Sequence, residues 1–375
     1  VFTVLSVNLL GDVVRDSVGR GIAVRPLPAS RASVPGNTGK EGDTLARATG
    51  NDILRIKDLG VAVRGREGGE VPVITGLSLS IARGETLGLV GESGCGKTLT
   101  GLSILDLIGV GGRSTHGSIR LGGKELRGLG QKDMAKVRGN EVAMVFQDPT
   151  TSLNPAYAVG NQIAEVLRTK MGMSKRQAWA RTVELIDRVG IPRPAERANA
   201  FPHELSGGMA QRIAIARALS CNPKLLIADE PTTALDVTVQ QEILDLFRDL
   251  QDEYGMAILF VTHDLAVAAD ICDRIAVMYA GEIVELAPVD ELFAQPHHPY
   301  TAGLLSATTH ASNREPPLPT IKGAVPAPRL WPEGCRFAER CEFRKSICEK
   351  RVTLTGSDRL VRCVRAEELD LRVAS

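Results

Sequence analysis

Residues 91–98 read Gly-Glu-Ser-Gly-Cys-Gly-Lys-Thr, which fits the pattern G-x-x-x-x-G-K-[ST] of a phosphate-binding loop. The apolar stretch Thr86–Val90 precedes it and predicts a buried strand, and a helical pattern runs from Lys97 to about Leu107. Glycines let the backbone curl so that several N–H groups face one anion, and the helix N-terminus adds partial positive charge. This strand–loop–helix setting predicts a nucleotide phosphate site in an α/β fold.

The residue types of the loop suggest individual roles. Lys97 would reach the β- and γ-phosphates, and the Thr98 hydroxyl would bind Mg²⁺. A position at a helix start should also lower the pKa of the Cys95 thiol, although an unconstrained loop position explains this cysteine as well. The predicted ATP contacts in the loop are Gly91, Ser93, Gly94, Cys95, Gly96, Lys97 and Thr98.

A carboxylate pair follows a second apolar strand, predicted at residues 225–228. Asp229 suits the coordination shell of Mg²⁺, and Glu230 beside it could polarise an attacking water. Taken alone, an Asp-Glu pair after a strand is more often the solvated start of a loop. Together with the phosphate loop, the pair predicts hydrolysis of the bound nucleotide.

The remaining pattern between residues 51 and 310 alternates short apolar runs with helical periodicity, as in an α/β domain. Further buried strands are predicted at 142–146 and 257–261. A wholly helical insert is predicted at about 159–190, where Ser174 and Gln177 form a capping box. A later helix, with apolar residues from Val239 to Tyr254, should end at Gly255.

The segment Leu205-Ser206-Gly207-Gly208 is similar to the signature loop of ATP-binding cassette (ABC) proteins. With the phosphate loop, it makes the chain resemble an ABC transporter ATPase subunit over about residues 52–310. Other motifs follow in the family's order: Gln147 in VFQDP matches the Q-loop, Asp236 in TTALD the D-loop, and His263 in VTHD the switch histidine. The resemblance implies a P-loop NTPase cassette, with a RecA-like core and a helical subdomain.

The resemblance also implies roles and cofactors. ATP and Mg²⁺ would be bound, with Gln147 on the metal or its water, Glu230 as the catalytic base and His263 on the γ-phosphate. Each site would be shared between two subunits, so that a dimer is required for turnover. The residues implied to contact ATP held by the opposite subunit are Ser206, Gly207, Gly208 and Asp236. In one departure, Val63 occupies the place where family members usually carry an aromatic residue that stacks on adenine.

Several stretches resemble the peptide/nickel branch of importers: GESGCGKT, FQDPTTSLNP and PHHPYT at 296–301. This implies a heterodimer with a homologous ATPase, two permease subunits and an extracellular or periplasmic substrate-binding protein. The chain would then lie at the cytoplasmic face of the cell membrane and import di- or oligopeptides. Nickel, glutathione or oligosaccharide are alternative cargoes, and a soluble ABC protein acting on ribosomes or DNA is an alternative class.

Composition agrees with a globular chain that binds no nucleic acid. Lys and Arg number 45 against 44 Asp and Glu, a net charge of +1, and only 4% of residues are aromatic. No run approaches the roughly 18 apolar residues of a membrane span. We expect the possible end of a fused permease at 1–18, a flexible linker at 19–50, the ATPase domain at 51–310 with its helical subdomain at about 150–220, and an extension at 311–375.

The extension carries four cysteines, Cys335, Cys341, Cys348 and Cys363. Their spacing lacks the C-x-x-C pairs of common zinc modules, so a four-thiolate iron–sulfur cluster, zinc and unpaired structural thiols are all open. The sequence GCRFAERC resembles the tail of peptide-importer ATPases, which implies a [4Fe–4S] cluster rather than zinc. Such a cluster would staple a small module that has little apolar core. Of the three cysteines outside the extension, Cys221 and Cys272 are expected to be buried apolar residues.

Overall fold

The computed structural model of the protein describes residues 51–65, 68–233, 235–309 and 321–372. The expected permease end at 1–18 and the linker at 19–50 lie outside the described residues. Among the helices that are described, none is both long and apolar enough to cross a membrane.

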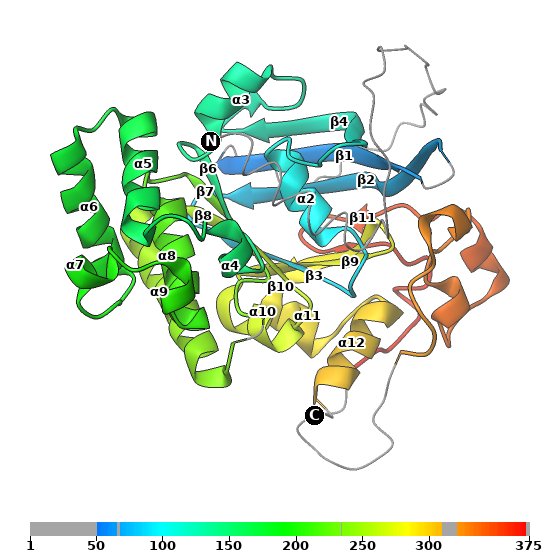
Figure 1. Ribbon diagram of the computed structural model, residues 1–375. Coiled ribbons are helices and arrows are strands. Elements are labelled where there is room, and N and C mark those ends of the chain that lie inside the picture. The colour runs from blue at the N-terminus through cyan, green and yellow to red at the C-terminus, as the bar shows by residue number, and fades with distance from the viewer. Residues whose placement is uncertain (1–50, 66–67, 234, 310–320, 373–375) are drawn as a thin grey trace.

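The larger sheet has eight strands in the order β11-β12-β10-β9-β3-β8-β7-β6 (Figure 1). Strands β9, β3, β8, β7 and β6 run parallel, and β10, β12 and β11 extend the sheet in antiparallel fashion. The strand bounds are β3 (Thr86–Val90), β6 (Val142–Val145), β7 (Leu225–Asp229), β8 (Ala257–Thr262), β9 (Arg274–Tyr279), β10 (Glu282–Pro288), β11 (Thr355–Gly356) and β12 (Leu360–Val361).

The parallel strands are buried on both faces, which explains their continuous apolar sequences. The four strands predicted from the sequence are all present. β3 has the predicted bounds, and β6, β7 and β8 differ from the predicted ranges by one residue at their ends.

A second, antiparallel sheet has the order β2-β1-β4-β5. Its strands are β1 (Asp52–Arg64), β2 (Glu70–Ala82), β4 (Gly112–Leu121) and β5 (Lys124–Glu125). Helix α2 (Lys97–Ile104) packs against β4 of this sheet and against β7 and β8 of the larger one. One hydrophobic cluster, which includes Ile56, Leu89 and Ile104, therefore joins both sheets.

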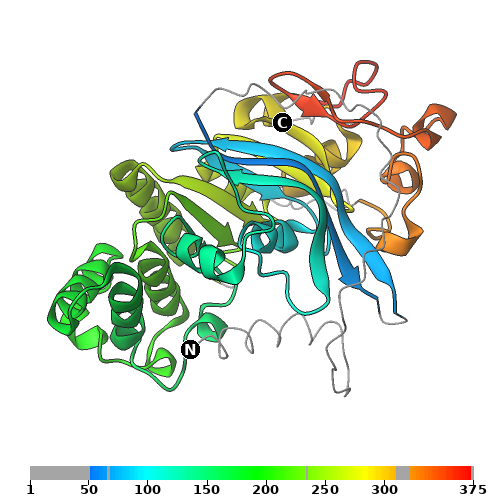
Figure 2. The same cartoon turned by 90° about the horizontal axis from the view of Figure 1, so that it is seen from above.

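The helices between β6 and β7 form a group on one side of the larger sheet (Figures 1 and 2). Here the Ser174 hydroxyl caps α6 by accepting a hydrogen bond from the backbone amide of Gln177, and the side-chain Oε1 of Gln177 accepts one from the Ser174 amide, so the predicted capping box is confirmed. These elements are α4 (Pro149–Ser152), α5 (Val159–Met171), α6 (Lys175–Arg188), α7 (Pro194–Arg197), the 3₁₀ turn η1 (Pro202–Glu204) and α8 (Gly207–Leu219).

Helix α9 (Val237–Tyr254) ends at Gly255, whose φ of 59° is the left-handed conformation expected of a helix C-cap. Its apolar positions, among them Phe247 and Leu250, pack into the core beneath the sheet. The remaining helices are α3 (Gln131–Val137), α10 (Leu265–Ile271), α11 (Val289–Ala294) and α12 (Pro299–Thr309).

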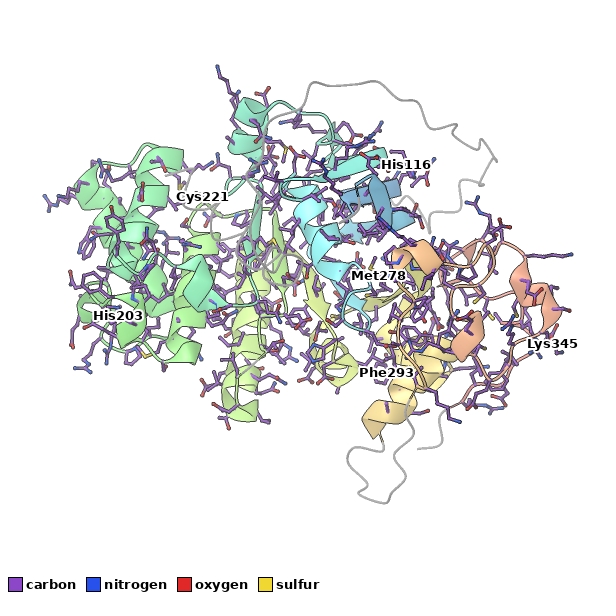
Figure 3. All side chains as sticks on the ribbon, turned by 45° about the vertical axis from the view of Figure 1, so that its right-hand side comes forward. His116, His203, Cys221, Met278, Phe293 and Lys345 are labelled. Carbon is purple, nitrogen blue, oxygen red and sulfur yellow. The ribbon has the colours of Figure 1, made fainter. Side chains whose placement is uncertain are left out.

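Residues 321–372, called the C-terminal module below, lie on the side of the sheet opposite to the helical group. Figure 3 shows the two extremes, with His203 in the helical group and Lys345 in the module. The module contains short 3₁₀ turns and contributes strands β11 and β12 to the larger sheet. The turns are η2 (Pro328–Leu330), η3 (Ala338–Arg340) and η4 (Ser346–Glu349).

Candidate active site

The phosphate loop connects β3 to α2, as the sequence predicts. Gly94 and Gly96 have φ values of 79° and 113°, a region that strains any residue with a Cβ. A Cβ on Gly91 would lie 2.1 Å from the carbonyl oxygen of Met278 in β9. Glycine is therefore required at 91 by the close approach of two strands, and at 94 and 96 by the curl of the loop.

Lys97 is held inside this loop. Its side-chain Nζ donates hydrogen bonds to the carbonyl oxygens of Gly91, at 2.8 Å, and of Glu92, at 3.1 Å. Ser93, Gly94 and Thr98 are exposed on the loop. The loop thus combines the cation of Lys97 with exposed residues at a helix N-terminus, where an anion would bind.

The structure corrects one prediction about the loop. A position at the helix start suggested a lowered pKa for the Cys95 thiol, but the side chain is fully buried and burial raises its pKa. Desolvation of the thiolate outweighs the nearby charge of Lys97. Cys221 and Cys272 are buried, as expected.

Thr98 and Asp229 form the second part of the site. The Thr98 hydroxyl donates a hydrogen bond of 3.1 Å to Oδ1 of Asp229, at the end of β7. Burial raises the pKa of Asp229 to about 6. A hydroxyl and one carboxylate fit Mg²⁺, which is commonly held by one or two carboxylates and completed by substrate phosphates and water. These two side chains would hold the ion.

Glu230 is the centre of the third part of the site. Its Oε2 atom accepts hydrogen bonds of 3.0 Å from Nε2 of Gln147 and from the hydroxyl of Thr233, and Nδ1 of His263 lies 3.3 Å from it. Gln147, Glu230 and His263 follow β6, β7 and β8, so the carboxyl ends of three adjacent parallel strands bring them together. Thr233 was not predicted, and its only signal in the sequence is its position three residues after Glu230.

The backbone at Glu230 is strained. Its φ of 45° is unusual for a residue with a side chain, and its amide donates a 2.8 Å hydrogen bond to the carbonyl of Val261. Strained residues of this kind concentrate at functional sites, where surrounding structure fixes them. The strain here turns the Glu230 carboxylate toward Gln147 and His263.

The signature residues lie on a different element. Ser206 caps α8 in the helical group, and its Oγ accepts a 3.3 Å hydrogen bond from the Met209 amide. Asp236 caps α9 by accepting 3.0 Å from the Val239 amide. A Cβ on Gly208 would lie 2.7 Å from the Val239 side chain. Ser206, Gly207 and Asp236 are exposed. They lie at the starts of α8 and α9, whereas the phosphate loop of the same chain connects β3 to α2.

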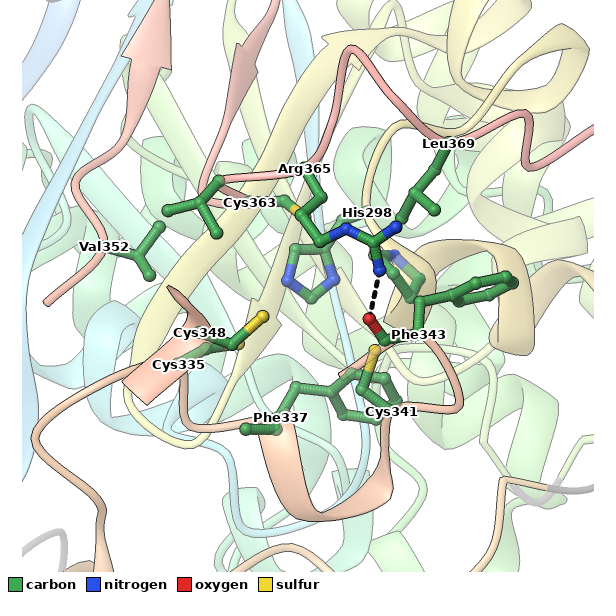
Figure 4. Close-up of a pocket in the computed structure, with 13 residues that line it drawn as sticks. His298, Cys335, Phe337, Cys341, Phe343, Cys348, Val352, Cys363, Arg365 and Leu369 are labelled. Atoms are coloured by element: carbon green, nitrogen blue, oxygen red, sulfur yellow. Dashed lines mark hydrogen bonds between the residues drawn. The ribbon is translucent and has the colours of Figure 1, made fainter. Parts of the chain in front are cut away.

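The four cysteines of the extension line one pocket, together with His298 and Phe337 (Figure 4). All are free thiols, and burial raises the pKa of Cys335 to about 11. Within the described ranges, however, no three His, Cys, Asp or Glu residues are placed to hold a metal ion. The predicted [4Fe–4S] cluster, and zinc as its alternative, are therefore not supported.

Comparison with known proteins agrees with this site. Residues 74–233 match the family described as ABC transporter, and residues 284–348 match the family described as oligopeptide/dipeptide transporter, C-terminal region. The chain is 49% identical over 302 residues to the oligopeptide transport ATP-binding protein AppD of Bacillus subtilis, which covers 80% of this chain and 92% of that protein.

Solved structures show the same cassette. A dimeric structure of the ATP-binding cassette MJ0796 in a post-hydrolysis state, bound to ADP and Pi, superposes with a TM-score of 0.56 at 29% identity, covering 63% of this chain and 98% of that one. CbiO1 of Clostridium perfringens, part of the ABC transporter complex cbiONQ, gives a TM-score of 0.56 at 27% identity, covering 65% and 91%.

This chain belongs to the ABC transporter family and is one of its ATPases. Its C-terminal region is of the oligopeptide/dipeptide transporter type.

Proposed function

We propose that this chain is the energy-coupling subunit of an importer for di- and oligopeptides. The observation that carries the proposal is the meeting of Lys97, Thr98, Asp229 and Glu230 at one edge of the parallel sheet. The cargo class is supported by the match of residues 284–348 to the oligopeptide/dipeptide transporter region and by the Bacillus subtilis relative, which is an oligopeptide transport ATP-binding protein.

The side chains support a direct attack of water on ATP. The phosphate loop amides and Lys97 would bind the β- and γ-phosphates, and Thr98 with Asp229 would hold Mg²⁺, which would supply positive charge to neutralise the phosphates. Glu230 accepts a proton from the attacking water as the new oxygen–phosphorus bond forms and the bond to the β-phosphate oxygen breaks. Gln147 and Thr233 fix the orientation of that carboxylate, and His263 contacts the γ-phosphate.

The site is completed by a second ATPase subunit in this proposal. Ser206, Gly207, Gly208 and Asp236 would contact ATP held by the partner, and the exposure of Ser206, Gly207 and Asp236 supports this. The N-terminus of α8 would offer its amides to that phosphate. The assembly would be a heterodimer with a homologous ATPase, since the sequence resembles one of two paired subunits.

Two permease subunits and an extracellular or periplasmic substrate-binding protein complete the importer. The helical insert near Gln147 is the proposed docking surface for the permease, and Tyr157 at its start is 58% exposed. Such docking would place the chain at the cytoplasmic face of the cell membrane. We assign residues 51–310 to the ATPase domain, about 150–220 to its helical subdomain, and 311–375 to the extension.

Reconstitution tests the proposal. The chain with its partner ATPase, both permeases and the substrate-binding protein should hydrolyse ATP faster when a peptide library is supplied, and labelled peptide should accumulate in proteoliposomes. If nickel, glutathione or an oligosaccharide stimulated ATP hydrolysis and peptides did not, that compound would be the cargo and the assignment of peptides would be wrong. Iron, sulfide and zinc analysis of the purified chain would distinguish a four-thiolate centre from free thiols.

A further inference from the structure

The C-terminal module reaches the phosphate loop through one ion pair. Nη1 of Arg340, in η3, lies 3.0 Å from Oε1 and 3.2 Å from Oε2 of Glu92, the second residue of the loop. The Arg340 side chain is only 6% exposed, and that of Glu92 is 29% exposed. Because water screens this pair poorly, it holds its partners more firmly than a surface ion pair does.

Glu92 also makes a contact with a second C-terminal element, helix α12. Its amide donates a 2.9 Å hydrogen bond to the hydroxyl of Tyr300, at the start of α12. Its carbonyl oxygen accepts the 3.1 Å hydrogen bond from Nζ of Lys97. One loop residue therefore connects two C-terminal elements to the lysine that would bind the phosphates.

Arg340 is itself fixed by several neighbours. Its Nε donates a 2.8 Å hydrogen bond to the carbonyl of Lys322, and its guanidinium lies 5.7 Å and 5.9 Å from the ring centres of Tyr279 and Phe337. Those two rings also pack edge to face. A planar guanidinium that donates hydrogen bonds to several neighbours is fixed in position, so it can fix the position of a carboxylate as well. The ammonium group of a lysine, on its flexible stem, fixes a carboxylate less well.

We propose that Arg340 is a positioning residue for the phosphate loop. Through Glu92 it holds the loop and Lys97 in the conformation that binds phosphate, so that the C-terminal module raises the affinity for ATP. A loop that is already ordered loses less conformational freedom when its ligand binds, which increases affinity without any new contact to the ligand. The inference rests on the proposed ATPase function.

The experiment measures the Kd of MgATP on the purified full-length chain, by titration calorimetry, together with its melting temperature. Arg340→Met keeps the apolar stem and removes the charge, and Arg340→Lys keeps the charge. Arg344→Met is the matched control, since Arg344 lies in the same module, is 47% exposed and pairs with Glu349. We expect Arg340→Met to raise the Kd about fivefold or more, Arg340→Lys to recover part of the loss, and Arg344→Met to leave the Kd unchanged.

A double-mutant cycle separates positioning from general stabilisation. Glu92→Gln should raise the Kd as well, and Arg340→Met in the Glu92→Gln background should add little, because both changes break the same contact. The proposal would be overturned if the fold-increases in Kd of the two single variants multiplied in the double variant. It would also be overturned if the Kd of Arg340→Met lay within twofold of the wild-type value. If Arg340→Met does not fold, Glu92→Gln alone must raise the Kd, since it leaves the packing of Arg340 in place. Failure of the wild-type chain to bind MgATP would instead contradict the proposed function.

Discussion

The imidazole Nδ1 of His263 lies 3.3 Å from Oε2 of Glu230, although 33 positions of sequence and one strand separate these residues. Adjacent parallel strands β7 and β8 end at the same edge of the sheet, which places both side chains there. The phosphate loop follows β3, the strand on the other side of β8. The groups needed to bind a phosphate and to activate water therefore meet because of the strand order.

Replacing Glu230 by Gln should abolish hydrolysis and preserve binding. The amide cannot accept the proton from water, so the rate of phosphate release should fall by about 10²–10⁴-fold, while the Kd of MgATP stays near the wild-type value. Phosphate release by the assembled transporter and calorimetry on the chain measure the two effects. Asp249→Asn, at an exposed position on α9 outside the proposed docking surface, is the control. Near-wild-type turnover by Glu230→Gln would remove Glu230 from the role of base.

Replacing Gly208 by Ala should lower the free energy of unfolding, because the added methyl would crowd Val239 of α9. The added methyl would lie 2.7 Å from the Val239 side chain, and overpacking of this kind typically costs about 1–3 kcal/mol of unfolding free energy. Val239→Ala makes room for that methyl, so the double variant should be more stable than the sum of the single effects predicts. Denaturant unfolding of the four proteins gives the cycle. An unchanged stability for Gly208→Ala would show that the two helices are not packed as described.

An aromatic residue at position 63 should strengthen binding of ATP. At the proposed adenine site, Val63 would leave the base without a ring partner, and stacking of a base on an aromatic side chain contributes about 1–3 kcal/mol, or roughly fivefold or more in Kd. Val63→Phe should therefore lower the Kd of ATP and leave that of inorganic tripolyphosphate unchanged. Val110→Phe, at a position 76% exposed, is the control. Equal effects on both ligands would place the base elsewhere.

His298 should make the chain sensitive to acid. The side chain is 1% exposed, and burial lowers its pKa from 6.5 to about 3. The unfolded chain therefore takes up a proton below pH 6.5 that the folded chain refuses, and stability falls as pH decreases. Between pH 6.5 and 5 this loss amounts to about 2 kcal/mol.

His298→Asn tests that dependence. The asparagine Oδ1 can accept the hydrogen bond that Nδ1 of His298 takes from the Tyr300 amide, at 3.1 Å. The variant should lose less stability than wild type between pH 7 and pH 5, whereas His203→Asn, at an exposed position, should behave as wild type. Melting curves at both pH values measure this. Parallel losses in wild type and His298→Asn would contradict the assignment.

The sequence predicted those parts of the molecule whose residue types obey local rules. The strand before Gly91, the capping box at Ser174 and the end of α9 at Gly255 all depend on neighbours within a few positions, and all are confirmed. Local hydrogen bonding and backbone conformation decide such features, so a window of sequence contains the necessary information.

The parts that the sequence did not predict depend on distant residues. Burial of Cys95 comes from its place in the hydrophobic cluster that joins both sheets, and it reversed the expected direction of the pKa shift. Arg340 lies 248 positions from Glu92, and no local pattern marks either residue as the other's partner. The spacing of the four cysteines did not indicate how their sulfurs are arranged in the pocket.

Binding of MgATP to the phosphate loop is the central claim, and titration calorimetry on the purified full-length chain tests it most directly. Wild-type chain should bind one ATP per chain in a Mg²⁺-dependent manner, and Lys97→Met, with an unchanged fold by circular dichroism, should bind at least about tenfold more weakly. No saturable binding by the wild-type chain, or equal binding by Lys97→Met, would contradict the account.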